Sequence, residues 1–377
     1  MRARVDSLRA RRARPVDPQR SLRTGATTLS AMIDALLRDM PTIYEVAKRA
    51  GVSTATVSRV LSRPDVVAPT TRRRVMQAVE RLGFTPNALS KHLRQARTGK
   101  LVVTVPDIAN PFFSLILQGI EDAAQREGYS VLLGDTQHEE AREERYAEML
   151  KRKEADGLIF LGHRLPKEAA SLMKSLAPRC APVVNGCEFS PRLGIPSVHI
   201  DNAKAAGEAM GHLYSLGHRR IGIITGPLVS PLSRDRLEGA TARAKKQHAE
   251  RDFVVMNGDF SIESGAVGAS RLLGRSEPPT AIFCFNDEMA IGVYQTAHRL
   301  GIRIPDDLSV IGFDDIRYAA CLIPPLTTVA QPMREIGEGT VRLLMQILKN
   351  PAVAPEPVTL PHILTIRSST VPPKPGR

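Results

Sequence analysis

Apolar residues in the segment 42–83 recur at helical spacing, and the first group of them predicts a short amphipathic helix. Four residues stand at i, i+3, i+4 and i+7 and therefore share one face (Ile43, Val46, Ala47, Ala50). Gly51 follows directly and can end a helix in the left-handed conformation. The pattern predicts a helix over 42–50, with Thr42 as its N-cap, and a tight turn at 51–53.

Two further helices are predicted in the same segment. Ser53 is a good N-cap for a helix with an apolar face (Val57, Val60, Leu61) and an opposite face that is small and polar apart from one Arg (Thr54, Ala55, Ser58, Arg59). A third helix is expected from Pro69 until Gly83, with buried residues at helical spacing (Val75, Val79, Leu82). Two short helices joined by a glycine turn and supported by a third are typical of a helix-turn-helix head. A generic three-helix subdomain with a solvated basic face has the same periodicity.

From residue 101 onward, short apolar runs alternate with stretches of helical period. These runs are 101–105, 130–133, 157–161, 182–184, 198–200, 221–225, 253–256, 281–285 and 309–312. Runs without internal polar alternation are typical of strands that are buried on both faces of a parallel sheet. Repeated strand–helix units therefore predict an α/β body with parallel sheets covered by helices. The body is large for one such sheet, so we expect two.

Charge is distributed unevenly along the 377 residues, whose formal net charge is +13. Residues 1–39 contain nine Arg and four Asp, and residues 40–100 contain twelve Lys or Arg and three acidic residues. The remainder of the chain is therefore nearly neutral. A basic head joined to a neutral body indicates that the head binds a polyanion and that the body serves another purpose.

Residues 1–39 are Arg-rich and lack a sustained apolar period. We interpret them as a disordered extension or as sequence upstream of the true start, with Met40 as an alternative start. The other interpretation is a basic arm that adds nonspecific phosphate contacts.

The segment 86–100 is also basic, and it carries Leu89 and Leu93 at i and i+4. It is too short and too polar to form a stable isolated helix. The simplest expectation is a linker between head and body.

Chemically useful side chains follow several of the apolar runs of the body. Ligands of open parallel sheets bind beyond the carboxyl ends of the strands, so these side chains are candidates for one pocket. They are aromatic, cationic, amide and acidic groups (Phe112, Phe113, Arg236, Phe260, Asn286, Asp287, Asp314). Aromatic faces stack on flat rings, and charged groups hold vicinal hydroxyls through strong hydrogen bonds. The set suits a polyhydroxylated small molecule with a flat ring, although each residue alone is also an ordinary loop, cap or core residue.

The sequence lacks the usual signatures of catalytic, metal and membrane sites. It contains no HExxH, GxSxG or P-loop motif and no GxGxxG after a strand, and its Cys and His residues lack metal-ligand spacing. We expect no enzyme, no metal and no cofactor; an α/β enzyme fused to a DNA-binding head is the remote alternative. No apolar run reaches the ~18 residues of a membrane helix, and no secretory signal is visible. We expect a cytoplasmic protein.

The segment 42–61 (TIYEVAKRAGVSTATVSRVL) resembles the DNA-binding signature of the lactose/galactose repressor (LacI/GalR) family. The resemblance continues through 82–87 and covers nearly all of 40–370. It implies that the second helix enters the major groove, with Thr54 and Ala55 selecting the operator and Arg59 reading guanine. It also implies a set of phosphate-positioning residues (Ser53, Thr56, Ser58, Thr71, Asn87). By the same resemblance, 86–100 is a hinge helix that folds only on DNA in the dimer, with Leu93 as a minor-groove wedge.

For the body, the resemblance implies a periplasmic-binding-protein-like fold of two lobes linked by three crossovers. The expected divisions are a head at 40–85, a first lobe at about 101–200 and 331–354, a second lobe at about 203–328 and 355–371, and a tail at 372–377. Five residues match effector-contacting positions (Phe113, Arg236, Phe260, Asn286, Asp314), and Phe112 is a neighbouring match. The partners implied are a pseudo-palindromic double-stranded DNA operator, a small-molecule effector and a second copy in a homodimer. Effector binding would change lobe closure and, through it, operator binding.

Several body segments, among them 105–114, 161–166 and 198–202, resemble the cytidine-responsive branch of the family. This implies a nucleoside effector, with its ring between Phe112 or Phe113 and Phe260 and its ribose hydroxyls at Arg236 and Asp314. An Arg and an Asp would hold the diol of a free sugar equally well, so a pentose or hexose is the alternative.

Overall fold

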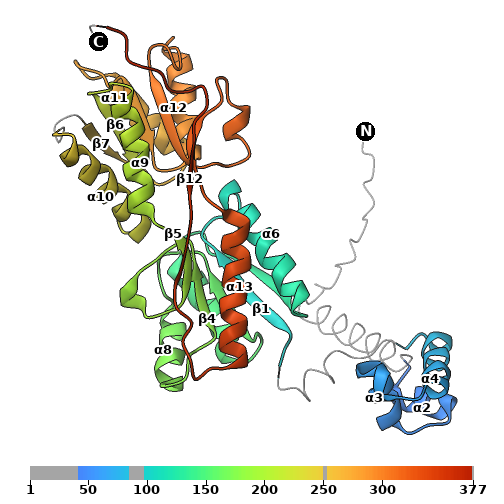
Figure 1. The fold of residues 1–377 in the computed structure, drawn as a ribbon. Helices are drawn as coiled ribbons and strands as arrows, with labels where there is room; N and C mark the ends of the chain where they lie inside the picture. Colours follow the sequence, from blue (N-terminus) through green and yellow to red (C-terminus); the bar gives the residue numbers. More distant parts are fainter. Residues whose placement is uncertain (1–40, 85–96, 249–252, 376–377) are drawn as a thin grey trace, which may run out of the picture. The chain divides into compact units, whose positions relative to one another are not determined.

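The computed structural model describes residues 41–84, 97–248 and 253–375, and the chain divides into two compact units between Lys91 and His92 (Figure 1). The predictions for residues 1–39, for Asn87 and Leu93 and for most of the hinge fall outside the described residues. None of the helices in the described ranges is both long and apolar enough to cross a membrane.

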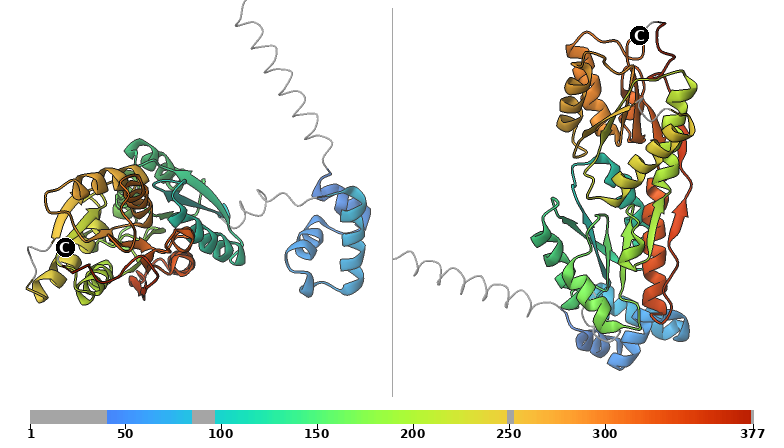
Figure 2. Two further views of the ribbon diagram at one scale, coloured as in Figure 1. Left: turned by 90° about the horizontal axis from the view of Figure 1, so that it is seen from above. Right: turned by 90° about the vertical axis from the view of Figure 1, so that its left-hand side faces the viewer.

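The first unit contains the three predicted helices, α2 (Ile43–Ala50), α3 (Thr54–Ser62) and α4 (Pro69–Leu82), and a short 3-10 helix, η1 (Pro64–Val66). Figure 2 shows them in blue from two further sides. Their packed core consists of Val46, Ala47, Ala50, Val57, Val60, Val75 and Ala78. Val79 and Leu82 pack against this core but are only half-buried, whereas Ala78 is buried.

Local chemistry fixes the ends of these helices. The Thr42 hydroxyl accepts a hydrogen bond from the Glu45 N–H at 3.3 Å, and the Glu45 carboxylate accepts one from the Thr42 N–H at 2.7 Å. This reciprocal capping box starts α2. Gly51, at φ 61°, ends it and leads into α3.

The second unit is an α/β body of two lobes, each built on one six-stranded sheet. The first lobe contains β1 (Lys100–Val105), α6 (Pro111–Arg126), β2 (Ser130–Asp135), α7 (Glu140–Lys151), β3 (Gly157–Phe160), α8 (Lys167–Leu176), β4 (Val183–Gly186), η2 (Pro191–Leu193), β5 (Ser197–Ile200), α13 (Met333–Lys349) and β11 (Val358–Leu360). Its strand order is β11-β5-β4-β3-β1-β2, and all neighbouring strands are parallel.

The second lobe repeats this plan with one antiparallel edge. It contains α9 (Asn202–Ser215), β6 (Ile221–Thr225), α10 (Pro231–Lys246), β7 (Phe253–Asn257), α11 (Ile262–Leu273), β8 (Ala281–Cys284), α12 (Asp287–Arg299), β9 (Ser309–Asp314), η3 (Ala319–Cys321), β10 (Thr327–Ala330) and β12 (Ile363–Thr365). Its order is β12-β10-β9-β8-β6-β7, and β12 runs antiparallel to β10.

Successive residues of the central strands enter different cores, which is why the apolar runs are continuous. In β1, Val103 belongs to the core that packs under α6 and α13, whereas Val102 belongs to the core that packs under α7 and α8. A strand covered by helices on both faces has no solvent-facing side chains. The nine predicted runs all correspond to strands of the two sheets.

The chain passes between the lobes three times, after β5, after β10 and after β11 (Figure 1). One expected boundary is wrong. The sequence interpretation put residues from 355 onward in the second lobe, but Val358–Leu360 pairs in parallel with β5 of the first lobe. The third crossover therefore lies between Leu360 and Ile363, because β12 is the strand that joins the second sheet.

Candidate functional site

The predicted DNA-reading side chains lie on the outer face of α3. Thr54, Ala55 and Arg59 are exposed, whereas Val57 and Val60, on the other face of the helix, are buried in the core of the unit. The core thus holds α3 by one face and leaves the other to solvent. A helix supported in this way can present its outer side chains to the major groove.

Three of the predicted phosphate-positioning residues (Ser53, Thr56, Thr71) lie at helix starts, whereas Ser58 lies in the middle of α3. Ser53 caps α3: its hydroxyl accepts from the Thr56 N–H at 3.2 Å and lies 3.0 Å from the Thr56 hydroxyl. Ser58 is half-buried on α3, and Thr71 is half-buried in the first turn of α4. Asn87 and Leu93 are outside the described residues.

A cleft between the two lobes of the body brings together all six predicted effector residues. The first lobe contributes Phe112 and Phe113 at the start of α6 and the second contributes Arg236, Phe260, Asn286 and Asp314. Each of the second-lobe residues lies at or after the carboxyl end of a strand or in the helix that follows it. The strand-end interpretation of the sequence therefore converges on one cavity.

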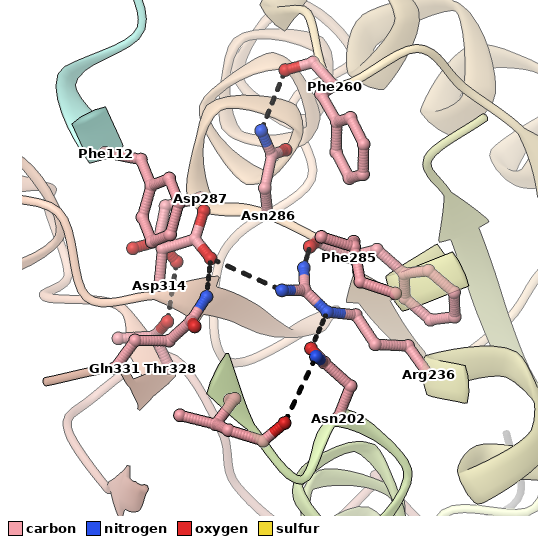
Figure 3. Close-up of polar contacts among 12 residues, drawn as sticks. Phe112, Asn202, Arg236, Phe260, Phe285, Asn286, Asp287, Asp314, Thr328 and Gln331 are labelled. Atoms are coloured by element: carbon pink, nitrogen blue, oxygen red, sulfur yellow. Dashed lines mark hydrogen bonds and ion pairs between the residues drawn. The ribbon is translucent and has the colours of Figure 1, made fainter. Parts of the chain in front are cut away.

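The aromatic side chains of the cleft are positioned by a ring–ring contact in the first lobe and by a hydrogen bond to the backbone in the second. Phe112 and Phe113 meet edge to face, with ring centroids 5.2 Å apart. Phe260 adopts φ 74°, in the left-handed region that a bulky residue rarely enters. Its carbonyl accepts a hydrogen bond from the Asn286 side-chain amide at 2.8 Å, which fixes this loop to the start of α12 (Figure 3).

Arg236 is buried in the floor of the cleft and held by several partners (Figure 3). Its Nε donates to the Asn202 side-chain oxygen at 2.8 Å, and Nη1 donates to the Phe285 carbonyl. The guanidinium carbon lies 3.6 Å from the centroid of the Phe313 ring. Nη2 lies 3.8 Å from Oδ1 of Asp314, so the cation and the carboxylate form a loose buried pair.

Asp314 ends β9 and accepts a hydrogen bond from the Gln331 side-chain amide at 2.7 Å. The neighbouring Asp287 is turned toward the protein, since it accepts from the Thr328 hydroxyl at 2.6 Å and from the Ile316 N–H at 2.8 Å. Asp287 is therefore a structural residue, while Asp314 and Arg236 line the open space.

Residues 42–87 match the family described as "Bacterial regulatory proteins, lacI family", and residues 210–370 match the "Periplasmic binding protein-like domain". The HTH-type transcriptional repressor CytR of Escherichia coli K12 is 41% identical over 330 residues, which span 87% of this chain and 96% of CytR. This chain belongs to the LacI family.

Two solved structures agree with this assignment. A lac repressor dimer bound to operator and the anti-inducer ONPF is 29% identical, with a TM-score of 0.79 over 88% of this chain and 99% of that one. A LacI-family regulator from Enterococcus faecium with bound ribose is 29% identical, with a TM-score of 0.65 over 73% of this chain and 100% of that one. CytR and DegA of Bacillus subtilis are named as a transcriptional repressor and a transcriptional regulator, and this LacI-family protein is a DNA-binding transcriptional regulator.

Burial raises the pKa of several acidic groups in the cleft of this LacI-family regulator. The pKa of Asp314 rises to about 7, although Arg236 and Gln331 act in the opposite direction. Burial, together with Asp107 and Asp314, raises the pKa of Glu288 to about 7 as well. These groups change charge near neutral pH, so binding in the cleft is expected to depend on pH.

Three residues of the regulator's cleft network were not predicted. Asn202 follows β5 and Gln331 follows β10, so the partners of Arg236 and Asp314 stand on two of the three crossovers. Glu188 follows β4 and is buried in the cleft. The strand-end rule that found Asp314 applies equally to Glu188 and Gln331, but their partners are distant in sequence and no local pattern indicates them.

Proposed function

We propose that this regulator is a dimeric, cytoplasmic repressor. Its affinity for a pseudo-palindromic operator would be controlled by a nucleoside bound between its two lobes. The observation that carries the proposal is the composition of the cleft, in which aromatic rings from both lobes face a buried Arg–Asp pair and an Asn. Similarity to a repressor named CytR over nearly the whole chain supports the same proposal.

On the DNA side, the exposed face of α3 would read bases, and the helix starts would contact phosphates. Arg59 can donate two hydrogen bonds to guanine, and Thr54 and Ala55 can contact a thymine methyl group. Ala68, the N-cap residue of α4, has no side-chain acceptor, so first-turn N–H groups near Thr71 are available for a phosphate oxygen. Residues 86–100 would form a hinge with Leu93 as a minor-groove wedge, and Asn87 would contact a phosphate.

On the effector side, the chemistry fits a flat ring joined to a diol. The base would stack between Phe112 or Phe113 and Phe260, because aromatic faces favour planar rings. Asp314 would accept from ribose hydroxyls, while the Nη2 group of Arg236 would donate to them. Asn286 would add an amide at the edge of the ring.

Binding would act on the operator through lobe closure. A ligand that contacts Phe112 of one lobe and Arg236 of the other favours the arrangement that brings both together. Dimer contacts and hinges would then differ between the two states, and a coupling of about 1–3 kcal/mol is typical of such systems.

Isothermal titration calorimetry of the full chain with cytidine, adenosine and ribose tests the effector. We expect cytidine to bind at micromolar to submillimolar concentration, and Phe260→Ala to weaken it at least tenfold through loss of stacking. Tyr44→Ala, which removes an exposed ring from the other unit, should leave cytidine binding unchanged. Failure of any nucleoside to bind at millimolar concentration would reject the nucleoside proposal. Operator binding with and without cytidine then gives the sign of the response.

A free sugar is the second candidate, because the Enterococcus faecium relative is described with bound ribose. A diol engages an Arg and an Asp with or without an attached base. Ribose binding tighter than cytidine in the same titrations would favour this alternative.

A further inference from the structure

Glu188 makes a direct polar contact between the two lobes. It follows β4 of the first lobe, and its carboxylate accepts from the Ser230 hydroxyl at 2.9 and 3.2 Å and from the Leu232 N–H at 3.4 Å. Both partners belong to the start of α10 in the second lobe. Glu188 and Ser230 are buried, so this contact lies inside the cleft and not at its rim.

The start of α10 lacks a cap from its own lobe. Ser230 occupies the N-cap position, but its side chain makes no capping hydrogen bond, and Pro231 has no N–H. A helix start leaves backbone N–H groups unpaired and carries partial positive charge, and a carboxylate satisfies both. Glu188 supplies that acceptor from across the lobe boundary. Arg236, which holds Asn202 and faces Asp314, lies only one turn further along α10.

We propose that Glu188 is a positioning residue that completes the start of α10 only when the lobes are together, and so couples closure of the cleft to the placement of Arg236. The coupling to an effector rests on the function proposed above. The capping itself does not, and it is tested separately without ligand.

The first lobe offers a matched control for this arrangement. Glu144 of α7 accepts from the Lys167 N–H at 2.6 Å and from the Glu168 N–H at 2.9 Å, and thereby caps α8. This cap joins two helices of the same lobe. Its loss should loosen α8 without changing communication between the lobes.

The ionisation of Glu188 makes closure of the lobes depend on pH, which can be measured. Burial raises the pKa of Glu188 to about 7; the bonds from Ser230 and Leu232 and the charge of Arg236 lower it, and Asp235 raises it. The Cys187 thiol and His163 of the β3–α8 loop line the same cleft, and burial raises the pKa of the first and lowers that of the second. An open cleft would return Glu188 to solvent and to an ordinary pKa. Closure then takes up a proton between about pH 4.5 and pH 7, so it is favoured as the pH falls through this window.

Hydrogen exchange of the ligand-free full chain tests the cap. Glu188→Ala should raise the exchange of the amides of 232–235 by about tenfold or more relative to wild type, with no change at 167–170. Glu144→Ala should do the reverse. Unchanged exchange at 232–235 in Glu188→Ala would overturn the proposal, whether or not any effector is known.

Cytidine and operator titrations test the coupling. Glu188→Ala should abolish most of the effect of cytidine on operator affinity, while Glu144→Ala should preserve it. Glu188→Gln keeps an acceptor but cannot ionise, so it should preserve the effect of cytidine on operator affinity. The change in cytidine affinity between pH 8 and pH 6 should be about tenfold smaller in Glu188→Gln than in wild type. Asp314 and Glu288 contribute the remaining pH dependence in all variants. A wild-type pH profile in Glu188→Gln, or full coupling in Glu188→Ala, would refute the inference. If exchange behaves as expected and no nucleoside binds, the effector assignment fails and the cap stands.

Discussion

Arg59 and Glu288 are two charged side chains of this regulator that the fold does not require. Arg59 is exposed on α3 and contributes nothing to the core of its unit. Glu288 is half-buried at the start of α12, where Asp107 and Asp314 oppose its charge. A neutral residue at either position is compatible with the fold. Such positions are where changes affect function more than stability.

Arg59→Ala should reduce affinity for the preferred operator by about 1–3 kcal/mol and leave binding to unrelated duplex almost unchanged, because two hydrogen bonds to guanine are lost. Fluorescence anisotropy with operator and scrambled DNA measures both. Arg74→Ala, an exposed change on α4, should instead weaken both equally and lower the salt dependence by about one ion. Equal losses for both duplexes in Arg59→Ala would remove its role in reading bases.

Glu288→Gln should stabilise the protein at pH 8 by about 1 kcal/mol and have little effect near pH 4.5. The folded pKa of Glu288 is raised to about 7, so the ionised form costs stability above that pH and the cost disappears below the unfolded value. Urea denaturation at both pH values measures the difference. Asp307→Asn should show the opposite sign, since Arg303 and Lys374 lower the pKa of Asp307.

Close helix crossings organise the layers of both lobes. Where α6 crosses α13, Gly119 lies against the Arg334 carbonyl and Gly337 lies against the Ile116 carbonyl. A methyl group at either position would meet backbone, which cannot move aside as a flexible side chain can. The two helices approach this closely because glycine occupies the contact on both sides.

Gly337→Ala should destabilise the protein by about 2 kcal/mol despite the better helix propensity of alanine, because overpacking against a carbonyl outweighs it. Chemical denaturation gives the value. Gly162→Ala is the control, since its added methyl would meet nothing nearer than 3.8 Å. Comparable loss in both variants would show that the crossing is more tolerant than its geometry indicates.

The elements that the sequence predicted are those with a strong local signal. The strands buried on both faces, such as β1 and β6, appear as continuous apolar runs. The edge strands β11 and β12 have three residues each and stand beside prolines, so no run marks them. Their pairing partners decide their place, which is why the boundary at 355 was wrong. For the same reason Arg236 was predicted and Glu188 was not. Arg236 follows a recognisable strand, whereas the partner of Glu188, Ser230, is 42 residues away in sequence.

At the scale of the whole molecule, a basic DNA-binding head and a nearly neutral body are joined by a short basic linker. The two units carry different physical interactions, since phosphate binding weakens with salt and the buried cleft is little affected by it. Residues 86–100 join the two units covalently. A substitution in this segment can therefore test coupling while the residues of both units stay unchanged.

Leu93→Ala should weaken binding to the preferred operator at least tenfold and leave nonspecific binding nearly unchanged, because a minor-groove wedge contributes only where the DNA is bent. Gel-shift titrations with operator and random duplex, at fixed salt, measure the ratio. Cytidine affinity serves as the control and should not change. Equal losses on both duplexes would indicate that the segment is only a tether.

The three passages of the chain between the lobes have a consequence for biosynthesis. Strands β1 to β5 leave the ribosome early, yet α13, which covers one face of their sheet together with α6, begins only at Met333. Val103, Ile159 and Val184 share a core with Ile336 and Leu344 of α13. Those two residues are translated only after most of the second lobe. The nascent chain thus exposes part of an apolar sheet face until α13 has been translated. A product truncated before residue 349 cannot complete its first lobe and leaves this surface open to chaperones and proteases.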